Sequence, residues 1–196
     1  MKVRLSSLYV IGWSCWAFAF VASGQVPSSS ISKASRNILS SSRSLTVAPS
    51  VSERTRESIA AWEAGEAVNI EPIVLLVELD PLERDPGAEI LVFLNKQGEH
   101  ETPLQTDPNF VSSFGLYSAV KGFESSHAKF YVDITKACSR IKQMPNQHLL
   151  PLQITLVLAP LGGRKLPENL QINIRDVKVL ARDEWQELKR RDAASI

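Results

Sequence analysis

The clearest indication of the fold class is the stretch LQITLVLAPLGGRKLPENLQINIRDVKVL, residues 152–180. Apolar residues recur at every second position of residues 152–158, and this alternation predicts a strand with one inward face. The proline and glycines of residues 160–163 predict a turn, and residues 170–180 predict a second long strand. Two strands joined in this hairpin-like way are typical of antiparallel β-structure.

The second of these strands changes its inward face part-way along. Ile172 and Ile174 lie on one parity of the alternation, whereas Val177 and Val179 lie on the other. A single inserted residue restores the same buried face to both halves of such a strand. The sequence therefore predicts a β-bulge near Arg175-Asp176.

Four more strands are predicted upstream of this pair. They are separated by clusters of Asp, Pro, Asn and Gly, and the last of them runs into one or two helical turns over residues 135–141. About six strands with one short crossover helix predict a mainly all-β fold, an antiparallel β-sandwich or barrel. The four strands are expected at residues 70–79, 89–94, 110–119 and 128–134.

Residues 1–24 are predicted to be a signal peptide. Lys2 and Arg4 supply a positive start, residues 8–21 are apolar, and small residues precede Gln25. An uncleaved membrane anchor is the alternative, but the apolar stretch is shorter than the roughly 20 residues that a spanning helix needs. We therefore expect export to an extracellular or periplasmic location, with no stable membrane anchor after signal cleavage.

The rest of the chain divides by composition. The serine-rich segment 25–52 is predicted to be a flexible linker, because it has few large apolar residues. Residues 53–69 predict a short helix or linker, residues 70–180 the β-domain, and residues 181–196 a charged tail that extends as a short exposed helix. The tail contains Lys189-Arg190-Arg191, which either touches an acidic surface or, as we favour, is solvated.

The charge balance argues against one class of partner. The whole chain has a formal charge of +1, and removing the two basic residues of the signal peptide leaves 20 basic and 21 acidic residues. A nearly neutral chain has no general electrostatic attraction for phosphate backbones. Binding of nucleic acid is therefore not expected.

Cysteine and histidine are scarce. Cys138 is the one cysteine left after the signal peptide, so no internal disulfide is expected, and we interpret it as a buried hydrophobic side chain. His100, His127 and His148 lie in separate predicted loops. A zinc or copper site needs three or four ligands together, so three solvated histidines are favoured over a site that forms only on folding.

An acidic cluster follows the strand at residues 70–79. Such carboxylates can form a calcium site or a glycosidase pair, but the neighbouring Arg84, Pro81 and Pro86 favour a solvated turn. The cluster consists of Glu78, Asp80, Glu83 and Asp85.

Two further patterns resemble catalytic or ligand-binding motifs only superficially. Ser112-Ser113 falls on a predicted strand and is not interpreted as a nucleophile. Gly162-Gly163, followed by Arg164 and Lys165, is interpreted as a turn rather than a phosphate-binding loop. We therefore predict no catalytic, cofactor-binding or metal-ligating residues, no cofactor, and a chain that is not an enzyme.

Aromatic residues leave a binding function open. Phe110 and Phe114 alternate along a predicted strand, where burial is the commoner fate. Trp62, Tyr117 and Phe123 are the candidates for exposed rings that stack on sugars. An independent extracellular module that binds polysaccharide or a cell surface is thus one hypothesis.

Five short motifs occur in order between residues 90 and 179. Together they resemble the C-terminal β-domain that follows the dicopper domain in tyrosinases and plant polyphenol oxidases. The resemblance covers about residues 70–180, and each motif alone is weak. The motifs are Ile90–Asn95 (ILVFLN), Ser112–Leu116 (SSFGL), Tyr131–Ala137 (YVDITKA), Ile154–Val157 (ITLV) and Ile174–Val179 (IRDVKV).

The resemblance implies a fold and a partner rather than an activity. In that family the oxidase reaction belongs to an upstream helical domain whose histidines bind copper, and this chain has neither the length nor the histidines for it. The resemblance implies a secreted, non-catalytic accessory domain that shields or helps to fold a copper-oxidase catalytic domain in trans. The alternatives are the binding module and a remnant of a copper-dependent o-diphenol oxidase.

Overall fold

The computed structural model describes residues 37–67, 70–96, 105–120, 127–145 and 147–194. The chain divides into two units, residues 1–34 and 35–196, and every described residue belongs to the second. The predicted signal peptide and the first part of the predicted linker therefore lie outside the described residues. No described helix combines the length and the hydrophobicity that a membrane span requires.

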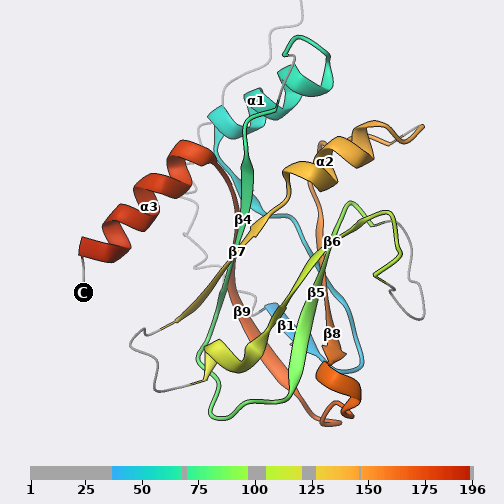
Figure 1. Cartoon of the computed structure of the whole chain (residues 1–196), viewed down its shortest axis with the longest axis vertical. Coiled ribbons are helices and arrows are strands. Elements are labelled where there is room, and N and C mark those ends of the chain that lie inside the picture. The colour runs from blue at the N-terminus through green and yellow to red at the C-terminus, as the bar shows by residue number, and fades with distance from the viewer. Residues whose placement is uncertain (1–36, 68–69, 97–104, 121–126, 146, 195–196) are drawn as a thin grey trace, which may run out of the picture. The chain divides into compact units, whose positions relative to one another are not determined.

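The described unit contains two β-sheets, which confirms the predicted all-β class (Figure 1). All of its strand pairs are antiparallel except β3–β9, which is parallel. The first sheet, sheet A, has the order β1 (Asn37–Ser40), β9 (Gln171–Ala181), β4 (Ile73–Leu79) and β7 (Ala128–Asp133), with β3 (Ser50–Val51) also paired to β9. The second, sheet B, has the order β2 (Leu45–Val47), β8 (Ile154–Pro160), β5 (Ala88–Leu94) and β6 (Phe110–Gly115).

The predicted flexible linker is wrong over residues 37–51, because this segment contains the three short strands β1, β2 and β3. Leu39 on β1 is fully buried and pairs with Ile172 on β9. The next strand, β2, pairs with β8 of the other sheet, so one short segment is attached to both sheets. The serine content predicted a linker because the segment has few large apolar side chains. Pairing with β8 and β9 nevertheless satisfies its backbone hydrogen-bonding groups and needs few such side chains.

The predicted bulge is confirmed at the predicted place. Glu78 pairs with Asp176, but the next residue of β4, Leu79, pairs with Ile174. Arg175 is therefore the extra residue of β9. The bulge keeps Ile174 and Val177 on the buried face although they are three positions apart, and both are at most 5% exposed.

The hydrophobic core lies between the sheets, and alternate residues of the long strands supply most of it. β5 contributes Ile90, Val92 and Leu94, each fully buried, as the period of two along a strand requires. At least 33 hydrophobic residues of the described chain are buried. A core of this size allows a domain without an internal disulfide to fold.

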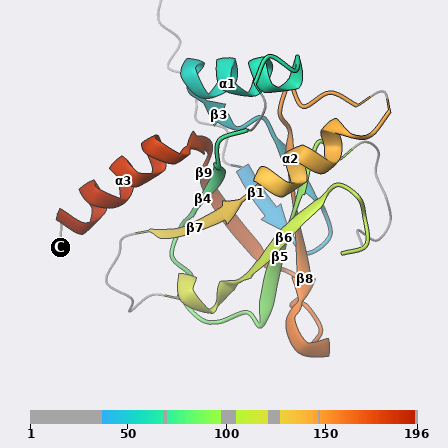
Figure 2. The same cartoon turned by 45° about the horizontal axis from the view of Figure 1, so that its top comes forward.

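Two helices cover one end of the two sheets (Figures 1 and 2). α1 (Glu53–Glu63) begins after Ser52, whose hydroxyl caps the helix by accepting a hydrogen bond from the Thr55 amide. α2 (Thr135–Lys142) follows β7, and its Thr135 amide donates to Asp133. The two helices meet where the Lys142 ammonium donates to the Trp62 carbonyl.

The remaining elements are shorter or lie at the C-terminal end. The strand predicted over residues 110–119 ends at Gly115 and continues as the 3-10 helix η1 (Leu116–Ala119), because this turn buries Leu116 in the core. A second 3-10 helix, η2 (Leu161–Gly163), occupies the predicted glycine turn. α3 (Arg182–Ala194) follows β9 directly and forms the expected helix in the charged tail.

Candidate functional site

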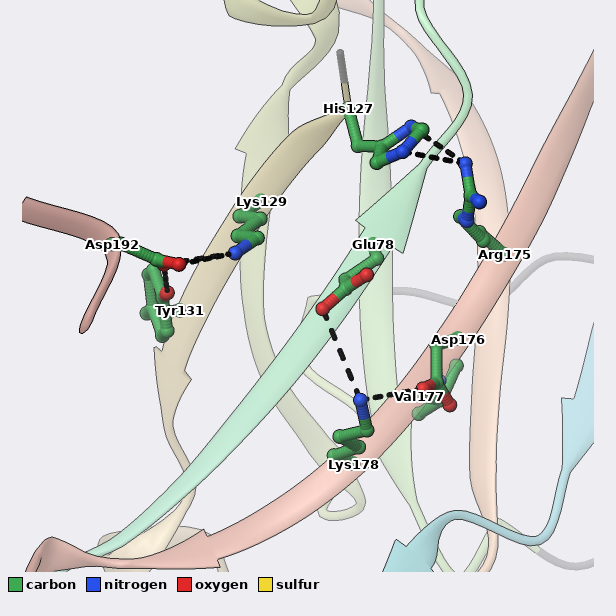
Figure 3. A network of polar contacts seen from close by, with 9 residues as sticks. All are labelled: Glu78, His127, Lys129, Tyr131, Arg175, Asp176, Val177, Lys178 and Asp192. Atoms are coloured by element: carbon green, nitrogen blue, oxygen red, sulfur yellow. Dashed lines mark hydrogen bonds and ion pairs between the residues drawn. The ribbon is translucent and has the colours of Figure 1, made fainter. Parts of the chain in front are cut away.

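A network of charged and polar side chains covers the outer face of sheet A, away from the core (Figure 3). Strand register places Glu78 of β4 between Lys129 of β7 and Asp176 of β9. The Lys178 ammonium lies 2.7 Å from the Asp176 carboxylate and 4.0 Å from that of Glu78. The hydrogen bond to Asp176 raises the pKa of Lys178, so this lysine stays charged.

The same face carries α3. Both carboxylate oxygens of Asp192 lie 2.8 Å from the Lys129 ammonium, and the Tyr131 hydroxyl lies 3.3 Å from one of them (Figure 3). Burial, with the charge of Asp192 next, raises the pKa of Tyr131 to about 12. Tyr131 therefore stays a neutral hydrogen-bond donor near neutral pH. The contact joins residues 63 positions apart in the sequence.

The rings beside this contact attach the middle of α3. The ring centroids of Trp185 and Tyr131 are 6.4 Å apart, and the Lys189 ammonium lies 4.4 Å from the first and 5.7 Å from the second. Both distances are within the range of a cation–π contact. The indole nitrogen of Trp185 is buried without a hydrogen-bond partner in the described chain. α3 is thus held by a few polar and aromatic contacts, and none of its residues is buried.

A separate polar junction joins the start of α3 to α1. The Glu184 carboxylate accepts hydrogen bonds from the Thr55 hydroxyl at 2.7 Å and the Ala181 amide at 2.9 Å. Burial alone would raise the pKa of Glu184, but hydrogen bonds from Ser52, Thr55 and that amide outweigh it, and the pKa is lowered. Arg54 adds an ion pair of 2.6 Å with Asp183 beside it. The junction therefore attaches the start of α3 to α1.

Asn95 connects two strands, a role that was not predicted from the sequence, where it is only the last residue of the first motif. Its backbone has a φ of 49°, a left-handed conformation that asparagine tolerates better than most residues. Its side-chain oxygen accepts from the Gln153 amide at 2.7 Å, and its side-chain nitrogen donates to the carbonyls of His148 at 2.9 Å and Leu149 at 2.8 Å. Asn95 therefore attaches the end of β5 to the segment that leads into β8.

The acidic cluster of residues 78–85 does not converge on one point. Glu78 faces Lys178, and the Asp85 carboxylate accepts from the Gly87 amide at 2.9 Å. Asp80 lies 3.8 Å from the guanidinium of Arg175, the bulge residue. In the described part of the chain no three acidic, histidine or cysteine side chains gather as metal ligands would. The turn at Asp85–Gly87 agrees with the favoured interpretation of the cluster.

The two described histidines lie apart in separate contacts. Both ring nitrogens of His127 are within 2.7 Å of the Arg175 guanidinium (Figure 3). His148 instead lies 3.3 Å from the Glu63 carboxylate at the end of α1. His100 lies outside the described residues, so the structure does not bring His127 and His148 together and says nothing of the third.

Of the three aromatic candidates for ligand stacking, one is exposed in the described chain. Tyr117 is 64% exposed, whereas Trp62 is 7% exposed and forms part of the core, which corrects its interpretation as a surface ring. Phe123 lies outside the described residues. Near Tyr117, the rings of Phe114 on β6 and Phe130 on β7 stack at 4.2 Å and join the edges of the two sheets. We call Phe114, Tyr117 and Phe130 the aromatic edge.

The interpretation of Cys138 as a buried thiol is confirmed. Its side chain is fully buried on α2, and burial raises the pKa of the thiol to about 12. A thiolate, which is the reactive form, is therefore scarce near neutral pH. Gly162 and Gly163 have φ values of 64° and 74° in η2, which confirms the predicted turn, and Ser112 and Ser113 lie half-buried on β6.

Comparisons with known proteins give a distant match. No family model and no curated protein matches the chain. Among solved structures, recombinantly expressed latent aurone synthase, a polyphenol oxidase, matches at 13% identity and a TM-score of 0.38, over 74% of this chain and 25% of that one. A second structure of that enzyme, from its natural source, matches at 14% identity and a TM-score of 0.38 over 72% and 25%.

This chain thus spans about a quarter of the length of the structures it matches. At these identities and TM-scores the similarity assigns neither a family nor an activity to the chain. What the described surface offers chemically is ion pairing on sheet A and aromatic contact at the edge formed by β6 and β7. Both are means of binding another molecule.

Proposed function

We propose that this chain is an exported, non-catalytic β-sandwich domain that acts as an accessory, shielding or folding partner of a copper oxidase. The observation that supports it is the placement of the five sequence motifs. They fall in order on β5, β6, the β7–α2 junction, β8 and β9, which surround one core.

Some motif residues have structural roles beyond filling a strand. Asn95 ends the first motif and attaches β5 to the segment before β8. In the third motif Asp133 accepts from the first amide of α2, and the Thr135 hydroxyl accepts from the Ile73 amide of β4 at 2.9 Å. Polar residues at the ends of strands specify how the strands connect. Their order therefore favours a resemblance to the whole β-domain over a chance succession of residues that form β-strands.

The aromatic edge is the surface that we assign to the partner. Tyr117 is the most exposed of the large hydrophobic residues in the described chain, and Phe114 and Phe130 are half-buried and pack against the core. Aromatic side chains are enriched at protein interfaces because they bury much area at little cost in conformational entropy. Because the net charge of the chain is near zero, the affinity for the partner must come from contact area rather than from long-range electrostatic attraction.

The test is an activity and binding measurement with a separate oxidase domain. The purified chain is assayed for bound copper and for catechol oxidation, alone and mixed with a tyrosinase catalytic core. The proposal expects no stoichiometric copper, no turnover by the chain, and altered activity or copper loading of the added core. Copper bound tightly in a fixed ratio, or turnover by the chain alone, would contradict it.

Two variants distinguish binding through the aromatic edge from nonspecific hydrophobic binding. Tyr117→Ser should weaken the effect on the added core about tenfold or more, as loss of a central aromatic contact does. Leu161→Ser, which removes a 42% exposed side chain on η2, should leave the effect unchanged. Equal effects of both substitutions would argue against the aromatic edge.

A polysaccharide-binding module is the second candidate, and the exposure of Tyr117 favours it too. Retention of the chain on insoluble polysaccharide, lost in Tyr117→Ser, together with no effect on the oxidase core, would replace the first proposal by the second.

A further inference from the structure

Lys189-Arg190-Arg191 on α3 is a motif that the proposed function leaves unused. In the whole sequence an arginine directly follows a lysine or another arginine at Arg190 and Arg191 and nowhere else. The basic pair Arg164-Lys165 on the surface has the opposite order and ends in lysine. Serine endoproteases of the secretory route that recognise paired basic residues cleave after such an arginine, so the chain carries one site of this kind.

The site is accessible and lies in a weakly attached element. The side chains of Arg190 and Arg191 are 75% and 74% exposed, and each forms an ion pair with Glu187 one turn earlier on the same helix. No residue of α3 is buried, so opening the end of the helix exposes little apolar surface. An endoprotease binds its substrate as an extended segment, and elements with few buried contacts open most readily.

We infer that Lys189–Arg191 is a processing site for a paired-basic endoprotease, and that cleavage there detaches the end of α3 from sheet A. In the reaction water adds across the Arg191–Asp192 peptide bond. The carbonyl carbon of Arg191 takes the oxygen and becomes a carboxylate, and the nitrogen of Asp192 takes the protons and becomes an ammonium group. The inference rests on the export included in the proposed function, because these proteases act along that route.

The position of the bond links cleavage to the fold. Asp192, the residue directly after the site, is the α3 residue whose carboxylate binds Lys129 and Tyr131 of β7. Cleavage after Arg191 separates that carboxylate from the helix. Lys189 keeps its contacts with the rings of Trp185 and Tyr131, but the ion pair to sheet A is lost. The protease therefore removes the contact that also limits its access.

The first experiment is digestion of the purified chain with a paired-basic serine endoprotease, followed by intact-mass measurement. We expect loss of the mass of residues 192–196, and no loss in the double variant Arg190→Gln/Arg191→Gln. Lys165→Arg creates a second paired site in the exposed turn after η2 and serves as the positive control. An intact C-terminal end in a sample whose created site at residue 165 is cut would overturn the inference.

The second experiment tests the link to sheet A. Lys129→Gln removes the ion pair without altering the segment that the protease reads, and it should speed cleavage about two- to fivefold, the factor that a partly exposed pair is worth. Lys178→Gln is the matched control, because Lys178 lies on the same face but pairs with Asp176. Unchanged cleavage in Lys129→Gln would refute the link. Neither experiment uses an oxidase or requires export, so their failure is distinct from failure of the proposed function.

Discussion

Replacing Asn95 by alanine should destabilise the fold by about 3 kcal/mol, although this side chain is not in the core. The substitution removes one accepted and two donated hydrogen bonds, to Gln153, His148 and Leu149. Each contributes about 0.5–1.5 kcal/mol net. Alanine must also adopt the φ of 49°, which costs roughly 1 kcal/mol more than for asparagine. Partial exposure of the site lowers the sum to about 3 kcal/mol.

The assay is urea unfolding followed by circular dichroism at neutral pH. The urea concentration at the midpoint should fall, whereas the slope of the free energy of unfolding against urea concentration should stay the same, because the surface exposed on unfolding does not change. Asn95→Gly removes the same hydrogen bonds but adopts the positive φ freely, so it should lose about 1 kcal/mol less than Asn95→Ala. Asn169→Ala, in an exposed turn, is the control and should be neutral within about 0.5 kcal/mol.

Two results would refute this reasoning about Asn95. A loss in Asn95→Ala below about 0.5 kcal/mol would mean that water replaces the three hydrogen bonds at no cost. An equal loss in Asn95→Gly and Asn95→Ala would mean that the left-handed backbone conformation does not contribute.

Three further predictions concern other parts of the described chain. Leu39→Ala should cost about 2–5 kcal/mol by thermal or urea unfolding, because a fully buried side chain leaves a cavity, whereas Ile38→Ala on the same strand should cost under about 1 kcal/mol. Equal values would mean that β1 is not part of the folded unit. Glu184→Gln should lower the melting temperature at neutral pH relative to Glu57→Gln, and because the folded pKa of Glu184 is lowered, the difference from wild type should shrink as the pH falls through that pKa. A difference that grows in acid would contradict the assigned hydrogen bonds. Cys138 should resist a thiol reagent at pH 8 until urea is added, and the stability from its neutral thiol should be lost as the pH rises from about 9 to about 12. Rapid labelling of the folded chain would show that α2 opens.

Much of the fold was predictable because it depends on local periodicity. Alternation along residues 152–158 and 170–180 places the buried faces of β8 and β9, and the parity change locates the bulge at Arg175. Ser52 and Asp133 mark the starts of two helices because short polar side chains satisfy the free amides of the first turn. The candidate surface was harder to predict, since exposure of Trp62 and Tyr117 depends on what packs over each ring.

The order of the amino acids alone specifies the all-β class, the bulge, the helix starts and the paired-basic motif of α3. Each depends on the identity and spacing of residues that are close in the sequence. The period of a strand and the geometry of a helix cap relate that spacing directly to local structure. The strand pairing within residues 37–51 and the contact of Asp192 with Lys129 arise only in the folded chain. Those outcomes depend on which segments, far apart in the chain, come together in the fold. The local periodicity of a segment does not indicate which other segment it will contact.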